Sequence, residues 1–233
     1  GGRTSAVEQK CLMDSGGLPG RGGPPDKPVV LVVYRRSKSG ETAYGLLDQF
    51  KGYLVCDAAT NFNKSVQRNQ LTLVHCNDHA RRRFAEILKT LKSKEKARGW
   101  AASKAIDYYK QLYRIESQAK DLDPPQRLTL RQQKAVPIWN AFIDWAQKVI
   151  DGGIGHSPSR RALSYLLNHQ ETLQNYCKDG RLPISNIQSE HVAKTIALAR
   201  KNFLFADTPA GASASAMIYS VLESAKVNGH NVY

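Results

Sequence analysis

Short apolar runs occur along the first third of the chain, and their spacing predicts β-strands. The runs are PVVLVVY at 28–34, YLVC at 53–56 and LTLVHC at 71–76. Each is rich in β-branched or aromatic residues and is bounded by polar turns, which is the pattern of buried strands. Between the first two, TAYGLLDQF at 42–50 is typical of a short helix, although Gly45 weakens it.

From residue 77 onward the apolar positions recur every three or four residues, which predicts helices. Asn77 or Asp78 is the candidate cap of the first helix. Its predicted buried stripe consists of Ala80, Phe84, Ile87, Leu88 and Leu91. The block from about 97 to 178 is helical in pattern throughout, and Ser157-Pro158 marks a helix start within it.

Two further helices are predicted near the carboxyl end. Ser185 and Gln188 form a capping box that begins a helix running to about Arg200. The final helix covers about 211–227 and ends at Asn228-Gly229. Its predicted buried stripe consists of Met217, Ile218, Val221, Leu222 and Ala225.

The order of elements predicts an α/β core that is split by a large all-helical insertion. Residues 1–27 are rich in Gly and Pro and are predicted to be loop or disordered. Residues 28–96 would form the first part of the core, 97–180 the helical insertion, and 181–233 the C-terminal helices that complete the core.

Charge narrows the class of partner. The net charge is +14, and the sequence pI is about 9.7, which favours a polyanionic partner. Residues 81–104 hold nine Lys or Arg and two Glu, so this stretch supplies a net +7. It is either a solvated helix face or a surface that contacts nucleic-acid phosphate. No apolar run approaches eighteen residues, so no membrane span is predicted.

The four cysteines are scattered and form no CxxC pair, which indicates reduced thiols in a cytosolic protein. Cys76 and His79 have the C-x-x-H spacing of a zinc half-site, but no second pair of that kind follows. A buried thiol and a histidine at a helix start are the simpler interpretation. Several aromatic residues fall in the predicted helical stripes. Their favoured role is core packing, and the alternative is stacking on a nucleic-acid base. These residues are Trp100, Trp139, Trp145, Tyr108, Tyr109 and Tyr113.

Two acids are placed where a metal site could form. Asp57 ends an apolar strand, where its carboxylate would emerge at the rim of a sheet. Glu190 lies in the first turns of a capped helix, followed by Lys194, Arg200 and Lys201. Phosphodiester chemistry uses carboxylates from separate elements to hold Mg²⁺. The spacing alone also fits a turn residue at Asp57 and a helix pair between Glu190 and Lys194.

The order of four motifs adds to this picture. They are GPPDKPVVLVVYRRSKSGE, FKGYLVCDAATNFN, VHCNDHARRRFAEILK and the stretch from DGRLPISNIQSEHVAK to VLESAKVNG. Together they cover nearly the whole chain, which resembles the bacterial transposases of the insertion sequence sixty-six family. The resemblance implies a ribonuclease H-like mixed sheet core with an Asp-Asp-Glu triad and a divalent metal. Such enzymes cut transposon ends and transfer them into target DNA.

Carried over by position, Asp57 matches the second acid of the family and Glu190 the third. Both would hold Mg²⁺ or Mn²⁺, and the helical insertion between them is expected. Double-stranded DNA at the ends and target is the implied partner, and its phosphates would contact Arg81, Arg82, Arg83, Lys194, Arg200 and Lys201. The intact protein would be a homo-oligomer in the bacterial cytoplasm, associated with the nucleoid.

The first acid of the triad has no match. It should stand on the opening strand in an Asp-Glu-Thr-like motif, which is absent, so the core is expected to lack its N-terminal strand and that Asp to lie upstream of Gly1. Asp14 and Asp26 lie in Gly/Pro-rich sequence and are poor substitutes. The chain by itself is therefore predicted not to cleave DNA. A non-catalytic DNA-binding remnant and a helical protein-interaction module are the alternatives.

Overall fold

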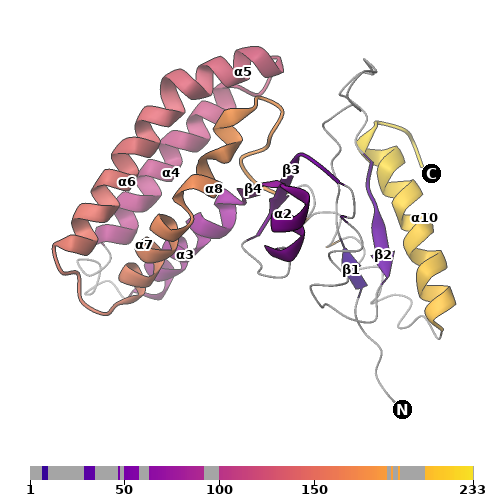
Figure 1. Ribbon diagram of the computed structural model, residues 1–233, viewed down its shortest axis with the longest axis horizontal. Coiled ribbons are helices and arrows are strands. Elements are labelled where there is room, and N and C mark those ends of the chain that lie inside the picture. The colour runs from indigo at the N-terminus through magenta and orange to yellow at the C-terminus, as the bar shows by residue number, and fades with distance from the viewer. Residues whose placement is uncertain are drawn as a thin grey trace. The chain divides into compact units, whose positions relative to one another are not determined.

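In the computed structural model the chain divides into two compact units. Unit 1 holds Gly1–Gly52, Ala59–Leu71 and Ile187–Tyr233, and unit 2 holds Tyr53–Ala58 and Thr72–Asn186 (Figure 1). The structure describes residues 7–9, 29–34, 47, 50–57, 63–91, 100–187, 190, 194 and 208–232. The predicted helix at 42–50 and most of the capped helix that follows Ser185 lie outside these described residues.

Unit 1 contains an antiparallel strand pair and a long helix. β1 (Val7–Gln9) pairs with β2 (Val32–Tyr34), so that Glu8 lies opposite Val33. β2 confirms the predicted strand at 28–34 for residues 32–34. β1 is a correction, because residues 1–27 were predicted to be loop or disordered. The unit also contains α2 (Asn63–Asn69), in the chain segment between the two strands of unit 2.

The long helix of unit 1 is α10 (Pro209–Val227). It begins where Thr208 Oγ1 accepts a hydrogen bond from the Gly211 N–H at 3.0 Å. It ends at Asn228, and Gly229 follows with a φ of 78°, a conformation that glycine adopts without strain. The predicted end is confirmed, and the start lies two residues before the predicted one.

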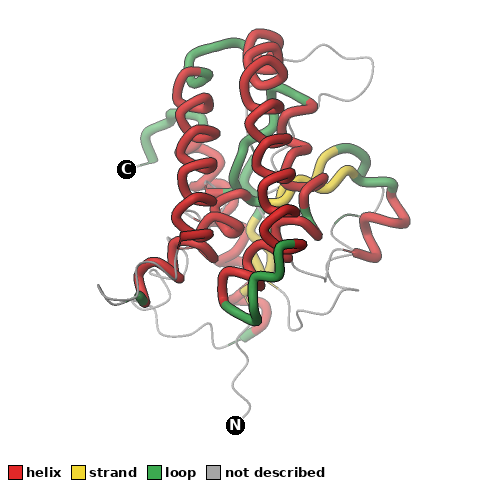
Figure 2. Tube along the Cα trace, turned by 90° about the vertical axis from the view of Figure 1, so that its left-hand side faces the viewer, coloured by secondary structure: helices red, strands yellow, loops and turns green. Residues whose placement is uncertain are grey.

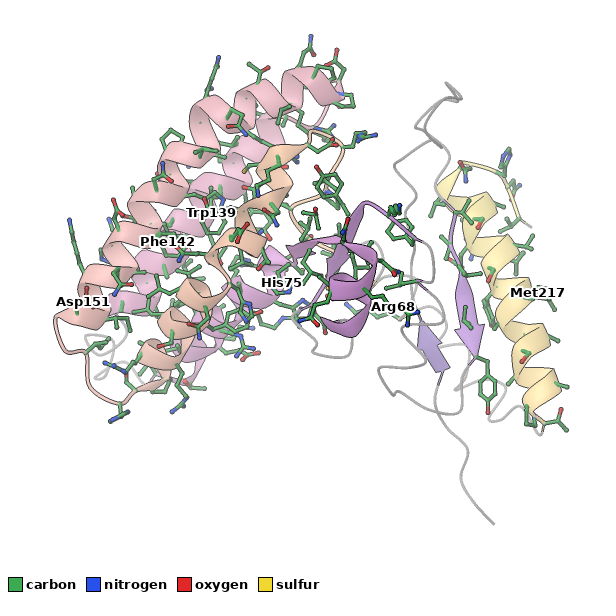
Figure 3. All side chains as sticks on the ribbon, viewed as in Figure 1. Arg68, His75, Trp139, Phe142, Asp151 and Met217 are labelled. Carbon is green, nitrogen blue, oxygen red and sulfur yellow. The ribbon has the colours of Figure 1, made fainter. Side chains whose placement is uncertain are left out.

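The predicted buried stripe of α10 is wrong for three of its members. Met217, Ile218 and Val221 are 70%, 60% and 64% exposed, and Met217 lies on the side of α10 away from β2 (Figure 3). The side that packs on β2 carries Ala216 and Ser220 instead. Apolar spacing identified a helix here, but small and hydroxyl side chains form its contact with the strand.

Unit 2 is built on two parallel strands. β3 (Tyr53–Cys56) and β4 (Thr72–His75) pair in register, with Tyr53 opposite Thr72 and Cys56 opposite His75. Both strands were predicted from sequence. They are short, and the helices that follow make up most of unit 2 (Figure 2).

α3 (Asn77–Thr90) follows β4 directly and buries Ala80 and Phe84, as its periodicity predicts. The predicted cap is wrong, because Cys76 occupies the N-cap position. Asn77 is buried instead, and its amide donates to the carbonyl oxygens of Leu173 and Ile184 at 3.0 and 3.2 Å.

Residues 100–178 are helical, as the sequence predicts. The helices are α4 (Trp100–Gln118), α5 (Pro124–Leu130), the π-helical turn η3 (Arg131–Ala135), α6 (Val136–Asp151), α7 (Pro158–Asn168), α8 (Gln170–Gln174) and the 3₁₀ turn η4 (Asn175–Lys178). α4 and α6 run side by side (Figures 1 and 2). Ser157 caps α7 as predicted, because its hydroxyl accepts the Arg160 N–H at 3.1 Å.

Aromatic side chains fill the space between α4 and α6. Trp139 and Phe142 stack at 5.8 Å (Figure 3). The Tyr109 ring meets both of them edge-on. All three are fully buried, which confirms core packing for them. Trp100 differs, since it is 53% exposed while its ring meets Trp145 at 6.3 Å.

The segment that ends the helical bundle makes two close contacts. One is a side-chain amide bound to β4, and the other is a backbone contact with α5. Asn175 Nδ2 donates to the carbonyl of Leu73 in β4 at 2.6 Å. Gly180 passes so close to α5 that a Cβ there would lie 1.8 Å from the carbonyl oxygen of Pro124. A side chain at 180 would therefore push this loop off α5.

The structure is thus α/β with a high helical content, and a ribonuclease H-like core stays a prediction, as do the predicted domain boundaries. Described Cys56, Cys76 and Cys177 are buried free thiols, as predicted. Among the described helices, none is both long and apolar enough to cross a membrane.

Candidate functional site

The candidate site of unit 2 lies at the carboxyl ends of β3 and β4. Because the strands are parallel and in register, both end at the same edge of the sheet. Cys76 continues the ladder, donating its N–H to the Cys56 carbonyl at 2.9 Å. Asp57 follows Cys56 and is exposed at this edge. Crevices outside the carboxyl ends of parallel strands are where α/β proteins bind ligands.

The carboxylate of Asp57 is available to a cation. It forms no hydrogen bond or ion pair with the residues that the structure describes. An exposed carboxylate on a rigid strand end is the hard oxygen ligand that Mg²⁺ prefers. Metal binding by Asp57 stays a prediction.

His75 lies beside this edge, where β4 meets the helical bundle (Figure 3). Its Nδ1 is 2.8 Å from Thr172 Oγ1, and the Thr172 hydroxyl also lies 2.9 Å from the His169 carbonyl oxygen. The His75 and His169 rings meet edge-on at 4.8 Å. Burial lowers the pKa of His75 to about 4, with a further lowering by His169 and an opposing effect of Asp57.

Tyr165 and Arg83 extend the same surface. The Arg83 guanidinium lies 3.9 Å from the centroid of the Tyr165 ring, and that ring lies 4.5 Å from His169. Burial raises the pKa of the Tyr165 hydroxyl, Arg83 lowers it, and the charge of Asp57 raises it again. Asp57 and Arg83 are therefore both electrostatic neighbours of Tyr165, although the three residues lie after β3, on α3 and on α7.

The three arginines predicted to contact DNA are all exposed on α3. Arg81 Nε lies 3.4 Å from Asp78 Oδ1 in an exposed pair, and Arg83 stacks on Tyr165. Exposure leaves all three arginines within reach of an external anion, as phosphate contact requires. DNA contact by Arg81, Arg82 and Arg83 stays a prediction.

The remaining predicted site residues belong to unit 1. Glu190 is helical and half-buried, and Lys194 is helical and exposed. Arg200 and Lys201 lie outside the described residues. Asp57 belongs to the other unit, so a metal ion shared by Asp57 and Glu190 stays a prediction.

Cys76 has the environment of a structural thiol. It is 1% exposed, and its Sγ accepts the Asn186 N–H at 3.5 Å. Burial is the main cause that raises the pKa of this thiol, while neighbouring N–H groups lower it. A zinc ion held by Cys76 and His79 stays a hypothesis.

Sequence reasoning missed His75 and Tyr165 as electrostatic neighbours of Asp57, and His169 and Thr172 as the residues that contact them. His75 could have been found, because it ends the strand predicted to run beside the strand that precedes Asp57. The other three lie in the helical region, more than a hundred residues away in the chain. Helical periodicity does not say which turn of α7 or α8 reaches the sheet.

Comparison with known proteins identifies relatives over most of the chain. The family model described as "Transposase IS66 family" matches residues 19–214. The uncharacterized proteins y4hP and y4jD of Sinorhizobium fredii (strain NBRC 101917 / NGR234) are 28% and 27% identical to this chain. These matches cover 86% and 90% of the chain but only 38% and 41% of the relatives, so the chain spans about two fifths of their length. No solved structure gives a significant match.

Proposed function

This chain belongs to the IS66 family of transposases, and from that premise we propose that it is the catalytic domain of a DNA transposase. In this proposal it takes part in metal-dependent cleavage of DNA at insertion-sequence ends and in strand transfer to target DNA. The proposed fold is a ribonuclease H-like mixed sheet with a large helical insertion.

The position of Asp57 is the observation that carries the proposal. The site requires a carboxylate that is fixed in place yet free to bind a cation, and Asp57 meets both conditions. The parallel pairing of β3 with β4 fixes the backbone on one side of it. Asp57 is exposed and forms no ion pair with described residues.

Glu190 is the proposed second ligand, and Mg²⁺ or Mn²⁺ is the proposed metal. The cation would neutralise charge on the scissile phosphate and activate the attacking water or hydroxyl. Acids that come from two different elements suit such a centre, because the folded chain then sets their spacing. The donor set of carboxylate oxygens matches these hard cations.

Double-stranded DNA is the proposed partner. Arg81, Arg82 and Arg83 on α3 would contact its phosphates, together with Lys194, Arg200 and Lys201. The intact transposase would act as a homo-oligomer on the nucleoid in the cytoplasm, bringing transposon ends and target together. The basic excess of the chain supports an anionic partner.

A second candidate is a DNA-binding remnant without catalysis. It is favoured by the absence of an Asp-Glu-Thr-like motif for the first acid of the triad. Two carboxylates hold a pair of metal ions poorly, so we expect no strand cleavage by this chain alone. Incubation with duplex DNA that carries the insertion-sequence end and Mn²⁺ tests this, and end-specific nicking would contradict it.

The metal site is tested directly by Mn²⁺ binding, followed by electron paramagnetic resonance of the free ion. We expect the wild-type chain to bind Mn²⁺, and Asp57→Asn and Glu190→Gln each to lose the same ion. Asp107→Asn is the matched control, because Asp107 is an exposed acid on α4. Mn²⁺ binding that survives both substitutions, alone and together, rules out the proposed centre.

A further inference from the structure

A continuous row of side chains connects α3 to β4 in unit 2. The Arg83 guanidinium lies over the Tyr165 ring at 3.9 Å, the Tyr165 ring contacts His169 at 4.5 Å, and His169 contacts His75 at 4.8 Å. We call these four residues the Arg83 row. They come from α3, α7, the junction of α7 with α8, and β4.

The inner end of the Arg83 row is fixed to the sheet. His75 belongs to β4, opposite Cys56, the residue that precedes Asp57. Thr172 Oγ1 lies 2.8 Å from His75 Nδ1 and so restricts rotation of the ring. The His75 and His169 rings then brace Tyr165, and Tyr165 supports the guanidinium. The row therefore supports Arg83 from the strand that pairs with β3, and Tyr165 interacts electrostatically with Asp57.

Charge is concentrated at the outer end of the row. Burial lowers the pKa values of both histidines, so both are neutral at pH 7. Burial raises the pKa of Tyr165, so its hydroxyl keeps its proton. Within the row, the positive charge therefore resides on exposed Arg83, and Tyr165 adds a neutral O–H donor beside it.

The guanidinium has donors left for an external anion. Among the described residues Arg83 forms no ion pair, and an arginine carries five N–H donors in a planar fork. The Tyr165 ring lies against the guanidinium and its hydroxyl interacts with it, and the other N–H donors of Arg83 remain for an external anion. Arginine presented in this way is suited to bind a phosphate through two hydrogen bonds at once.

We propose that Arg83 and Tyr165 form a subsite for a DNA phosphodiester next to the Asp57 site. The proposal rests on the proposed function, and it adds a residue of the helical region to the DNA contact. The bound phosphate would adjoin the one that undergoes reaction, so the subsite would set the position of the strand. His169, His75 and Thr172 are positioning residues, because they act through Tyr165.

The test measures affinity for a fluorescein-labelled DNA duplex by fluorescence anisotropy, in EDTA and again in Mg²⁺. We expect Arg83→Ala to weaken binding about tenfold and Tyr165→Phe about threefold, as for losing a charged and a neutral hydrogen bond. Arg114→Ala is the matched control, since it removes an exposed arginine from α4 of the same unit. It should weaken binding by less than Arg83→Ala does.

A shared phosphate also predicts that the two losses are not independent. The double variant Arg83→Ala with Tyr165→Phe should bind DNA only slightly more weakly than Arg83→Ala does. The subsite is overturned if Arg83→Ala weakens DNA binding no more than Arg114→Ala does, or if Tyr165→Phe binds DNA as tightly as the wild type. Circular dichroism confirms that the variants are folded. If the wild-type chain does not bind DNA at low salt, the proposed function fails together with the subsite. If the wild type binds DNA and only the variants behave as controls, the subsite alone fails.

Discussion

Arg131 is a buried cation whose partners come from α4 and from the segment at 176–179. Its side chain is 1% exposed, and it forms a two-point pair with Glu116 of α4 at 2.9 and 2.6 Å. Its Nη1 donates to the carbonyl oxygens of Tyr176 and Asp179 at 3.0 and 3.1 Å. The residue therefore joins α4 and η3 to the segment that leads back to the sheet.

Removing Glu116 should destabilise unit 2 strongly, because the charge of Arg131 would stay buried without its counterion. We expect Glu116→Ala to lower the free energy of unfolding by about 3 kcal/mol. Asp107→Ala breaks an exposed pair with Lys110 and should cost less than about 0.5 kcal/mol. Urea unfolding followed by tryptophan fluorescence measures both, since all three tryptophans lie in α4 and α6. Equal losses would show that the buried pair adds nothing.

His75 makes the stability of unit 2 depend on pH. Its pKa is about 4 in the folded chain and near 6.5 when unfolded, so the unfolded state binds the extra proton between these values. Stability is thus complete above pH 6.5 and is lost as pH falls toward 4. We expect about 2 kcal/mol of loss between pH 7 and pH 5 in EDTA. His75→Gln should remove much of this dependence of the unfolding free energy on pH, whereas substitution of exposed His156 should leave it unchanged. If His75→Gln shows the same dependence as the wild type, His75 is not its cause.

Residue types at the sheet edge could be predicted from sequence, but their contacts could not. The position of Asp57 could be predicted, because it directly follows an apolar strand and the end of that strand can be located from the sequence. Tyr165 and His169 carry no such local signal. Their distance from Asp57 depends on how α7 and α8 pack, and that packing results from side chains such as Leu166 and Leu173 across the whole bundle.

At the scale of elements, α10 is attached to β2 by hydroxyl groups. Ser220 Oγ accepts the Val32 N–H at 2.8 Å, and Ser224 Oγ accepts the Val30 N–H at 2.9 Å. Both hydroxyls also lie within 3.3 Å of the carbonyl oxygens of the same two residues. The helix thereby satisfies backbone groups that a neighbouring strand would otherwise satisfy.

These hydroxyls should protect the β2 backbone from solvent exchange. We expect the double variant Ser220→Ala with Ser224→Ala to leave two amides unsatisfied, at about 1 kcal/mol each. Hydrogen exchange of the Val30 and Val32 amides should accelerate accordingly, by about fivefold for each kcal/mol. Ser215→Ala changes an exposed serine of the same helix and should have no effect. Exchange that stays slow in the double variant would show that other contacts attach the helix.

The same contact explains why apolar periodicity misled for α10. Nearly every turn of this helix carries an apolar or small residue, so several faces could be buried. The pattern selects the widest apolar face, which contains Met217 and Val221, whereas the contact with β2 uses Ser220 and Ser224. Hydrogen bonds from a helix side chain to a strand backbone leave no periodic signal in the sequence, so this orientation could not be predicted.

At the scale of the whole molecule, the sequence predicted the positions of β2, β3 and β4, the helical region between residues 100 and 178, and the family, but it did not predict β1. Strands of this kind are short and bounded by turns, so local pattern suffices for them. The assembly of strands into one sheet depends on pairing between distant segments, and the described strands form two separate pairs. The ribonuclease H-like arrangement therefore depends on non-local contacts that periodicity does not encode.

The net charge of the molecule leads to the last prediction, which separates a DNA-binding face from a solvated helix. Each phosphate contact that a cation makes releases condensed counterions, so the logarithm of DNA affinity falls with the logarithm of salt concentration by about 0.9 per contact. If Arg81, Arg82 and Arg83 touch phosphates, their joint replacement by Ala should reduce this slope by up to about 3. The matched control replaces Arg114, Lys134 and Lys148, which are exposed elsewhere on the bundle. It removes the same charge, so an equal change in slope would mean that only the overall field of the protein attracts DNA. A larger change for the α3 arginines would place the nucleic acid on α3, beside the sheet edge that carries Asp57.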